Sequence, residues 1–234
     1  MKLAIMQPYL FPYIGYFQMI KAVDKFVFYD DVNFIKQGWI NRNRILLHSR
    51  DFMFTVPLEK ANSFCLIKDT LINKRLYESW KFKFTQTISQ NYKKAPYFDD
   101  TFRVITNVLN QNTTSISELS IESIKQVSEY LELNTLFIKS SEVYNNRGLE
   151  RQERLIAICK SENASHYVNA IGGQELYTKE SFEKENIKLN FIKPLPIEYK
   201  QFNNEFLPWL SIIDVLMFNS VEEIHNMLNN FELY

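Results

Sequence analysis

The chain has 234 residues, of which 46% are hydrophobic and 15% aromatic, so it is long enough to bury one large core. Lysine plus arginine equals aspartate plus glutamate, at 27 each, and this balance gives no overall field that would attract nucleic acid. No apolar run reaches the roughly 18 residues needed to span a bilayer, so we expect no membrane insertion. The start has no secretion-signal pattern, and Cys65 and Cys159 are expected to be free thiols, which together predict a cytoplasmic protein.

The first 44 residues predict a strand, a tight connection, a helix and a second strand. Residues 2–6 form an apolar run that ends at Pro8, because proline has no N–H to donate to a central strand pairing. Residues 25–29 form a second apolar run, and a dense polar cluster at residues 30–44 follows it. Between the two runs, one helical stripe collects Tyr13, Tyr16, Phe17, Ile20 and Val23.

The rest of the chain alternates strands and helices around a helical middle. Strands are predicted at residues 51–56, 135–139, 166–169 and 187–193, with a short one around Leu66. Helices are predicted at residues 149–161, 178–185 and 211–218, and a Ser220-x-x-Glu223 capping box opens a last helix that continues to Phe231. In the middle, three successive helices begin near Lys74, after Pro96 and at a capping Ser120.

This order predicts an α/β protein with a mainly parallel, doubly wound, Rossmann-like sheet. Residues 1–73 and 134–234 would form the α/β core. Residues 74–133 would form a helical insert packed on that core, within one compact unit. The insert would either act as a lid over a cleft or simply complete the core.

Three groups of residues are candidates for ligand binding, because the carboxyl ends of parallel strands share one edge of such a sheet. The first group lies before a helix N-terminus, where an anion is stabilised, or else forms only a rigid turn. The second is a set of donors with an aromatic platform, which suits a phosphate, or else is a salt-bridged surface loop. The third offers backbone N–H groups at a glycine pair, or else is a turn that needs positive φ. In that order, the groups are Gln7, Tyr9 and Tyr13; Lys36, Trp39, Asn41, Arg42 and Arg44; and Gly172, Gly173 and Tyr177.

The candidates for acid–base chemistry are Asp30, Asp31 and His166. The two aspartates follow the second strand, and one of them would face the cleft as a general base or hold a divalent cation. The alternative is that both cap a turn or pair with Lys36 or Arg42. His166 begins a strand that leads to the glycine pair. The three histidines have no metal-ligand spacing, so no protein-bound metal site is expected.

Several long motifs occur in order along the chain: QPYLFPYIGYF at residues 7–17, FVFYDDVNFIKQGWINRNRI at 26–45, YVNAIGGQELYTKESFEKENIKLNFI at 167–192, Tyr199-x-Gln201, and LSIIDVLMFN at 210–219. In these motifs the chain resembles the WbqC-like family of bacterial proteins. The resemblance implies a place in surface-polysaccharide biosynthesis, such as that of the lipopolysaccharide O-antigen. It supplies no catalytic residues.

The hypothesis that follows is a transferase that modifies a nucleotide-linked amino sugar, or another phosphate-bearing small molecule, by acyl or aminoacyl-type group transfer. Lys36, Arg42 and Arg44 would hold phosphates, and Trp39 would stack on a ring. One alternative is a nucleotidyl- or adenylate-forming enzyme that uses ATP and magnesium. Another is a non-enzymatic protein that binds a nucleotide sugar or a pathway partner. The cofactor stays open between magnesium with a nucleotide and a carrier-bound acyl donor, and the oligomeric state is not predicted.

Overall fold

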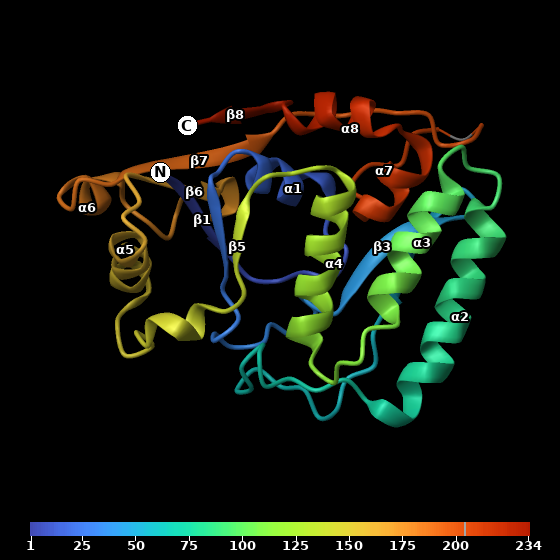
Figure 1. Cartoon of the computed structure of the whole chain (residues 1–234), viewed down its shortest axis with the longest axis horizontal. Helices are drawn as coiled ribbons and strands as arrows, with labels where there is room; N and C mark the ends of the chain where they lie inside the picture. The colour runs from blue at the N-terminus through green and yellow to red at the C-terminus, as the bar shows by residue number, and fades with distance from the viewer. Residues whose placement is uncertain (204) are drawn as a thin grey trace.

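The computed structural model describes residues 1–203 and 205–234. Its main feature is a six-stranded sheet in the order β5-β2-β1-β6-β7-β8 (Figure 1). Neighbouring strands are parallel except at the β7–β8 edge, where they run antiparallel. The fold is therefore α/β with a mostly parallel, Rossmann-like sheet, as predicted. The strands are β1 (Lys2–Met6), β2 (Lys25–Phe28), β5 (Leu136–Ile138), β6 (His166–Ala170), β7 (Lys188–Pro194) and β8 (Phe231–Leu233).

Helices cover both faces of this sheet, because successive strand residues point to opposite sides. In β1, Ala4 packs into one hydrophobic cluster, whereas Leu3 and Ile5 pack into the other. The first cluster includes residues of α1 (Ile14–Lys21), α7 (Ile212–Phe218) and α8 (Val221–Leu228). The second includes residues of α5 (Arg151–Ser161) and α6 (Lys179–Glu183), among them Cys159, which is a buried free thiol.

Three helices follow one another in the middle of the chain, α2 (Lys74–Tyr92), α3 (Phe98–Leu109) and α4 (Ile116–Tyr130). Figure 1 shows them side by side, extending away from the sheet at the end opposite α5 and α6. The three helices were predicted, but Ser120 was expected to cap α4, and this was wrong. Ser115 caps α4, and Ser120 lies buried inside the helix, where its hydroxyl donates to the carbonyl oxygen of Ile40. That residues 74–133 form an insert packed on the α/β core stays a prediction.

A separate antiparallel hairpin joins β3 (Arg42–Leu47) to β4 (Arg50–Thr55). The turn residues His48 and Ser49 have φ of 48° and 64°, the left-handed pair that a two-residue hairpin turn needs. No strand was predicted at residues 42–47, and this was wrong, because Arg42 and Arg44 lie in β3. A strand was predicted around Leu66, which makes only an isolated bridge, and the last helix was expected to continue to Phe231, which lies in β8.

No helix in the described part of the chain combines the length and the apolar character needed to cross a membrane.

Candidate functional site

An aromatic pocket of about 310 Å³ lies beside the connection from β1 to α1. Three segments that are distant in sequence form it: that connection, the region around β3, and the loop that precedes α7. Strand order reverses between β1 and β6, and in open α/β sheets ligands bind beyond the carboxyl ends of the strands at such a point. The pocket is lined by Tyr9, Pro12, Tyr13, Trp39, Asn43, Arg44 and Trp209.

Hydrogen bonds hold the β1–α1 connection against β3 and the residues just before it, and one residue of the connection has a strained backbone. The N–H of Leu10 donates to the carbonyl oxygens of Trp39 and Ile40, at 3.3 and 3.2 Å. Phe11 has a φ of 42°, a left-handed conformation that costs a side-chain-bearing residue about 1–3 kcal/mol. Its carbonyl oxygen accepts from Asn43 Nδ2 at 2.8 Å and from Ser211 Oγ at 2.7 Å, and these bonds stabilise the strained conformation.

Two phenol hydroxyls in the pocket, those of Tyr9 and Tyr13, have no hydrogen-bond partner within residues 1–203 and 205–234. Burial, with a smaller effect of Tyr13, raises the pKa of Tyr9 to about 12, and burial also raises the pKa of Tyr13. Both groups are therefore neutral at physiological pH and can donate. The ring of Tyr13 lies so close over Gly15 that a Cβ there would stand 2.4 Å from it, so any larger residue at this position would require the ring to move.

In the part of the chain that the structure describes, Arg44 is the only charged residue that lines the pocket. Its guanidinium pairs with Asp51 at 3.3 Å, donates to the carbonyl oxygen of Trp209 at 3.3 Å, and lies 5.7 Å from the ring centre of Trp39. Its Nε is buried and has no acceptor among the described residues. The pocket thus combines hydrogen-bond donors with aromatic rings, and no carboxylate of the described residues lines it.

The structure brings together four of the predicted binding residues, namely Tyr9, Tyr13, Trp39 and Arg44. The others do not line the pocket. Asn41 donates to the carbonyl oxygen of Val56 at 2.9 Å, and Arg42 donates to the carbonyl oxygens of Gly38, at 3.0 Å, and Gln37. Arg42 therefore stabilises the turn that carries Trp39, whereas Asn41 joins the residue before β3 to the residue after β4. Lys36 is exposed in that turn, and Gln7 is half-buried just after β1.

Asp30 and Asp31 are both buried and are directed toward groups other than the pocket. Asp30 accepts from Ser117 Oγ at 3.0 Å and Ser140 Oγ at 2.6 Å, and burial raises its pKa despite these bonds. Asp31 accepts from Ser141 Oγ and forms a buried ion pair with Arg154. Neither aspartate pairs with Lys36 or Arg42, so the partners that the sequence suggested are replaced by residues distant in the chain.

The remaining candidates lie around β6. His166 begins β6 and is in register with Lys2 and Lys188, at the amino edge of the sheet, whereas the pocket lies beyond the carboxyl edge. Gly172 and Gly173 follow the carboxyl end of β6 in a short 3₁₀ turn, and neither has a positive φ. A Cβ on Gly173 would stand 2.4 Å from Asn169 Nδ2, so close packing explains that glycine. Tyr177 packs with the hydrophobic cluster on the α5 side.

Three residues that line the pocket were not predicted as binding residues: Pro12, Asn43 and Trp209. Pro12 and Asn43 stand inside segments that were predicted to bind a ligand, but nothing marked them above their neighbours. Trp209 is 64% exposed and has a φ of 63°, an unusual backbone conformation for a bulky residue. Its ring centre lies 5.9 Å from that of Tyr13. No local sequence pattern indicates that it joins a pocket formed by residues so far away in the chain.

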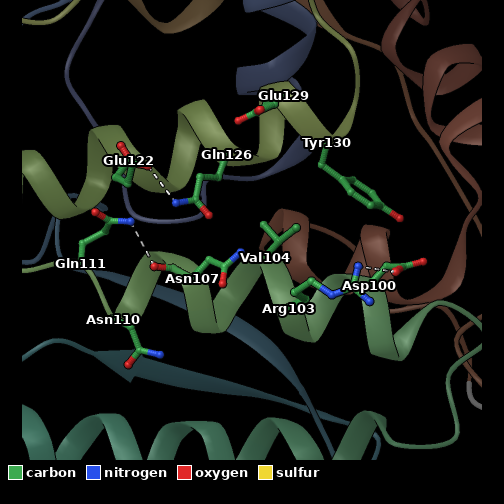
Figure 2. Close-up of a pocket in the computed structure, with 10 residues that line it drawn as sticks. All are labelled: Asp100, Arg103, Val104, Asn107, Asn110, Gln111, Glu122, Gln126, Glu129 and Tyr130. Atoms are coloured by element: carbon green, nitrogen blue, oxygen red, sulfur yellow. Dashed lines mark hydrogen bonds and ion pairs between the residues drawn. The ribbon is translucent and has the colours of Figure 1, made fainter.

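A larger cavity, of about 660 Å³, is an open groove between α3 and α4 (Figure 2). Its polar side chains largely satisfy one another. Arg103 pairs with Asp100 at 3.2 Å, Gln126 donates to Glu122 at 2.8 Å, and Gln111 donates to the carbonyl oxygen of Asn107 at 3.3 Å. The only aromatic residue among its lining side chains is Tyr130. The aromatic pocket is therefore the stronger candidate for a small-molecule site.

Comparison with known proteins supports the resemblance seen in the sequence. The chain is 29% identical over 218 residues to an uncharacterized protein, Rv1507c, of Mycobacterium tuberculosis, and the match covers 92% of each chain. No solved structure matches the chain. The sequence model of the WbqC-like protein family matches residues 7–226, which include every residue that lines the aromatic pocket. The chain belongs to the WbqC-like protein family.

Proposed function

We propose that this protein is a transferase of surface-polysaccharide biosynthesis that binds a nucleotide-linked amino sugar in the aromatic pocket. The observation that carries the proposal is the character of the lining: two free phenol hydroxyls and one guanidinium beside two tryptophan rings, with no carboxylate. Such a set of donors favours a ligand that carries an anionic oxygen, and the rings favour a ligand that also carries a flat or cyclic group.

Arg44 is the residue we assign to the phosphate. Its ion pair with Asp51 is solvent-exposed, with 29% and 49% of the two side chains accessible, and such pairs contribute only about 0–1 kcal/mol. A phosphate can therefore displace Asp51 at small cost. Arg42 and Lys36 have no part in this contact, because Arg42 is bonded to the backbone of its own turn and Lys36 is exposed outside the pocket.

The proposed reaction is acyl transfer from a carrier-bound thioester to the amino group of the sugar. The amino nitrogen attacks the carbonyl carbon, a C–N bond forms and the C–S bond breaks. The proton lost by the amine leaves with the carrier thiol. The contribution of the protein would be to position the two reactants, since the neutral tyrosines can donate a hydrogen bond but are not bases.

A second candidate is a protein that binds the nucleotide-linked sugar without turnover. The observation that favours it is the position of Asp30 and Asp31, whose carboxylates are buried and already bonded to serine hydroxyls and to Arg154. Adenylate or nucleotidyl transfer with ATP and magnesium is the third. The described residues contain no group of three or more metal-ligating side chains. The phosphates of the nucleotide, and not the protein, would therefore have to supply most of the ligands of the metal.

Calorimetric titration with UDP-glucosamine, whose amino group is free, tests the ligand assignment, with free glucosamine and ATP–magnesium as comparison ligands. We expect the nucleotide sugar to bind and the free sugar not to bind. Arg44→Ala should lower the affinity about 10- to 100-fold, because a charge-assisted hydrogen bond contributes about 1.5–3 kcal/mol. The matched control is Arg50→Ala, which removes an exposed arginine from the same hairpin. Equal effects of the two substitutions would remove the phosphate role from Arg44.

A product assay then separates the candidates. Formation of an acylated amino sugar from an acyl thioester supports the transferase. Binding without product under the same conditions supports the binding protein, and tighter binding of ATP–magnesium than of the nucleotide sugar supports the third candidate.

A further inference from the structure

Helix α2 presents a continuous exposed face on the outside of the molecule. Its opposite side is buried through Tyr77, Phe84 and Ile88. Figure 1 shows α2 as the outermost helix, at the end of the molecule away from α5 and α6. The exposed side of α2 and its C-terminal extension is therefore open to a partner.

This exposed side carries a regular pattern of cations and apolar residues. Residues seven and eleven positions apart lie almost on one line along a helix. Arg75 and Phe82 fall on one such line, and Leu76 and Lys83 fall on the next, with only serine and glutamine between the two lines. Two further lysines follow at the C-terminal end of α2: Lys93 is its C-cap, and Lys94 lies in the turn after it. We call these six residues the basic face. All six are exposed, Phe82 by 65% and Leu76 by 46%.

The charges of the basic face are not compensated. Among the residues that the structure describes, no acidic group pairs with Arg75, Lys83, Lys93 or Lys94. Glu78, the one acidic residue of α2, pairs with Lys81 at 2.9 Å. A chain whose formal net charge is zero thus concentrates positive charge on one side of one helix.

We propose that the basic face docks the protein onto the surface of an anionic lipid bilayer. Three of its four cations are lysines, which act as point charges toward a diffuse anionic surface, whereas recognition of individual phosphates in nucleic acid favours arginine. The helix is 19 residues long, so the face extends about 28 Å along a line that can lie flat on a membrane. The exposed Phe82 and Leu76 side chains would enter the headgroup region between the lysines. This surface attachment involves no membrane-spanning segment and is independent of the aromatic pocket.

Vesicle co-sedimentation of the full chain tests this docking. The probes are vesicles of phosphatidylcholine alone and of phosphatidylcholine with about one-third phosphatidylglycerol, at low and high salt. We expect binding only to the anionic vesicles, weakened by salt. Each basic residue near such a surface contributes about fivefold in affinity, so a variant with Lys83→Gln, Lys93→Gln and Lys94→Gln should bind about 100-fold more weakly. All three side chains are exposed, and circular dichroism would confirm that the variant is folded.

The matched control is a variant with Lys179→Gln, Lys184→Gln and Lys188→Gln, which makes the same charge change on exposed lysines around α6, at the other end of the molecule. It should bind like the unchanged protein. Phe82→Ser should weaken the binding that persists at high salt, whereas Phe82→Leu should preserve it. The proposal is overturned if both vesicle types bind equally or not at all, if the two triple variants lose equal affinity, or if the face retains a short nucleic acid at the same salt while the vesicles stay unbound.

Discussion

The side-chain amide of Asn43 donates to the carbonyl oxygen of Phe11 at 2.8 Å, and so joins β3 to the strained part of the β1–α1 connection. It also approaches the carbonyl oxygen of Leu10 at 3.3 Å, and its own oxygen accepts from the N–H of Arg44 at 2.8 Å. One buried side chain therefore fixes the arginine side of the aromatic pocket to the tyrosine side.

Replacement of this residue should loosen the pocket and destabilise the fold. Asn43→Ala removes the hydrogen bonds that its side chain makes to three backbone groups, of which the Phe11 carbonyl oxygen keeps the bond from Ser211 Oγ. We expect a loss of about 2–3 kcal/mol in the free energy of unfolding. Urea denaturation measures that loss, and calorimetry should show weaker binding of the nucleotide sugar by the folded variant. Asn33→Ala, at an exposed position, is the control and should change neither quantity. Unchanged stability in Asn43→Ala would show that these bonds do not fix the pocket.

Trp209 should show opposite effects on stability and binding. Its backbone is held in a left-handed conformation that glycine adopts freely, so Trp209→Gly should stabilise the protein by up to about 1 kcal/mol. The same change removes a ring from the pocket and should weaken ligand binding. Trp209→Ala removes the ring without relieving the strain, so it should weaken binding equally with no gain in stability. Differential scanning calorimetry with titration compares the two, and a stabilised Trp209→Gly that binds normally would exclude Trp209 from the site.

The buried ion pair of Asp31 and Arg154 should be structural. Arg154→Met leaves the Asp31 carboxylate buried without its counter-charge, and we expect a loss of about 3–5 kcal/mol in the free energy of unfolding. The double variant Asp31→Asn with Arg154→Met should recover much of that loss, because no charge is then buried. Both effects appear in urea denaturation curves. If Asp31→Asn alone abolished turnover with stability unchanged, the aspartate would have a catalytic role instead.

Buried tyrosines should make the protein sensitive to alkali. Burial raises the pKa of Tyr16, Tyr92 and Tyr167 well above the ordinary value of 10.0. A raised pKa in the folded state means that the unfolded chain releases these protons first, so stability is complete below about pH 10 and falls above it. The expected slope is about 1.4 kcal/mol per pH unit for each such tyrosine. Urea denaturation between about pH 8 and 11 measures it, and a flat profile would show that these phenols ionise freely in the fold.

Much of the fold could be predicted because its main elements have simple periodicities. The apolar run of β1 and the stripe of α2 correspond to strand and helix at residues 2–6 and 74–92. Strand β3 was missed because Arg42, Asn43 and Arg44 resemble a polar loop. Arg42 bonds to the turn before β3, Asn43 bonds to the carbonyl oxygen of Phe11, and Arg44 lines the pocket. None of these contacts can be inferred from the alternation of polar and apolar residues in a strand.

The lining of the aromatic pocket was predicted only where its residues lie close to the start of the chain. Tyr9, Tyr13, Trp39 and Arg44 were singled out because they follow two predicted neighbouring strands, and all four line the pocket. Asp30 and Asp31 were predicted either to place one carboxylate in the cleft, or to cap a turn or pair with Lys36 or Arg42. Their partners in the structure are remote in sequence, namely Ser117, Ser140, Ser141 and Arg154. Contacts across such distances depend on the packing of α4 and α5 and leave no local signal.

A crystal structure with UDP-glucosamine bound is the most direct measurement. We expect the phosphates beside the Arg44 guanidinium and the hydroxyls of Tyr9 and Tyr13, with a ring of the ligand against Trp39 or Trp209. A ligand found in the groove between α3 and α4, or elsewhere with the aromatic pocket empty, would contradict the proposed site.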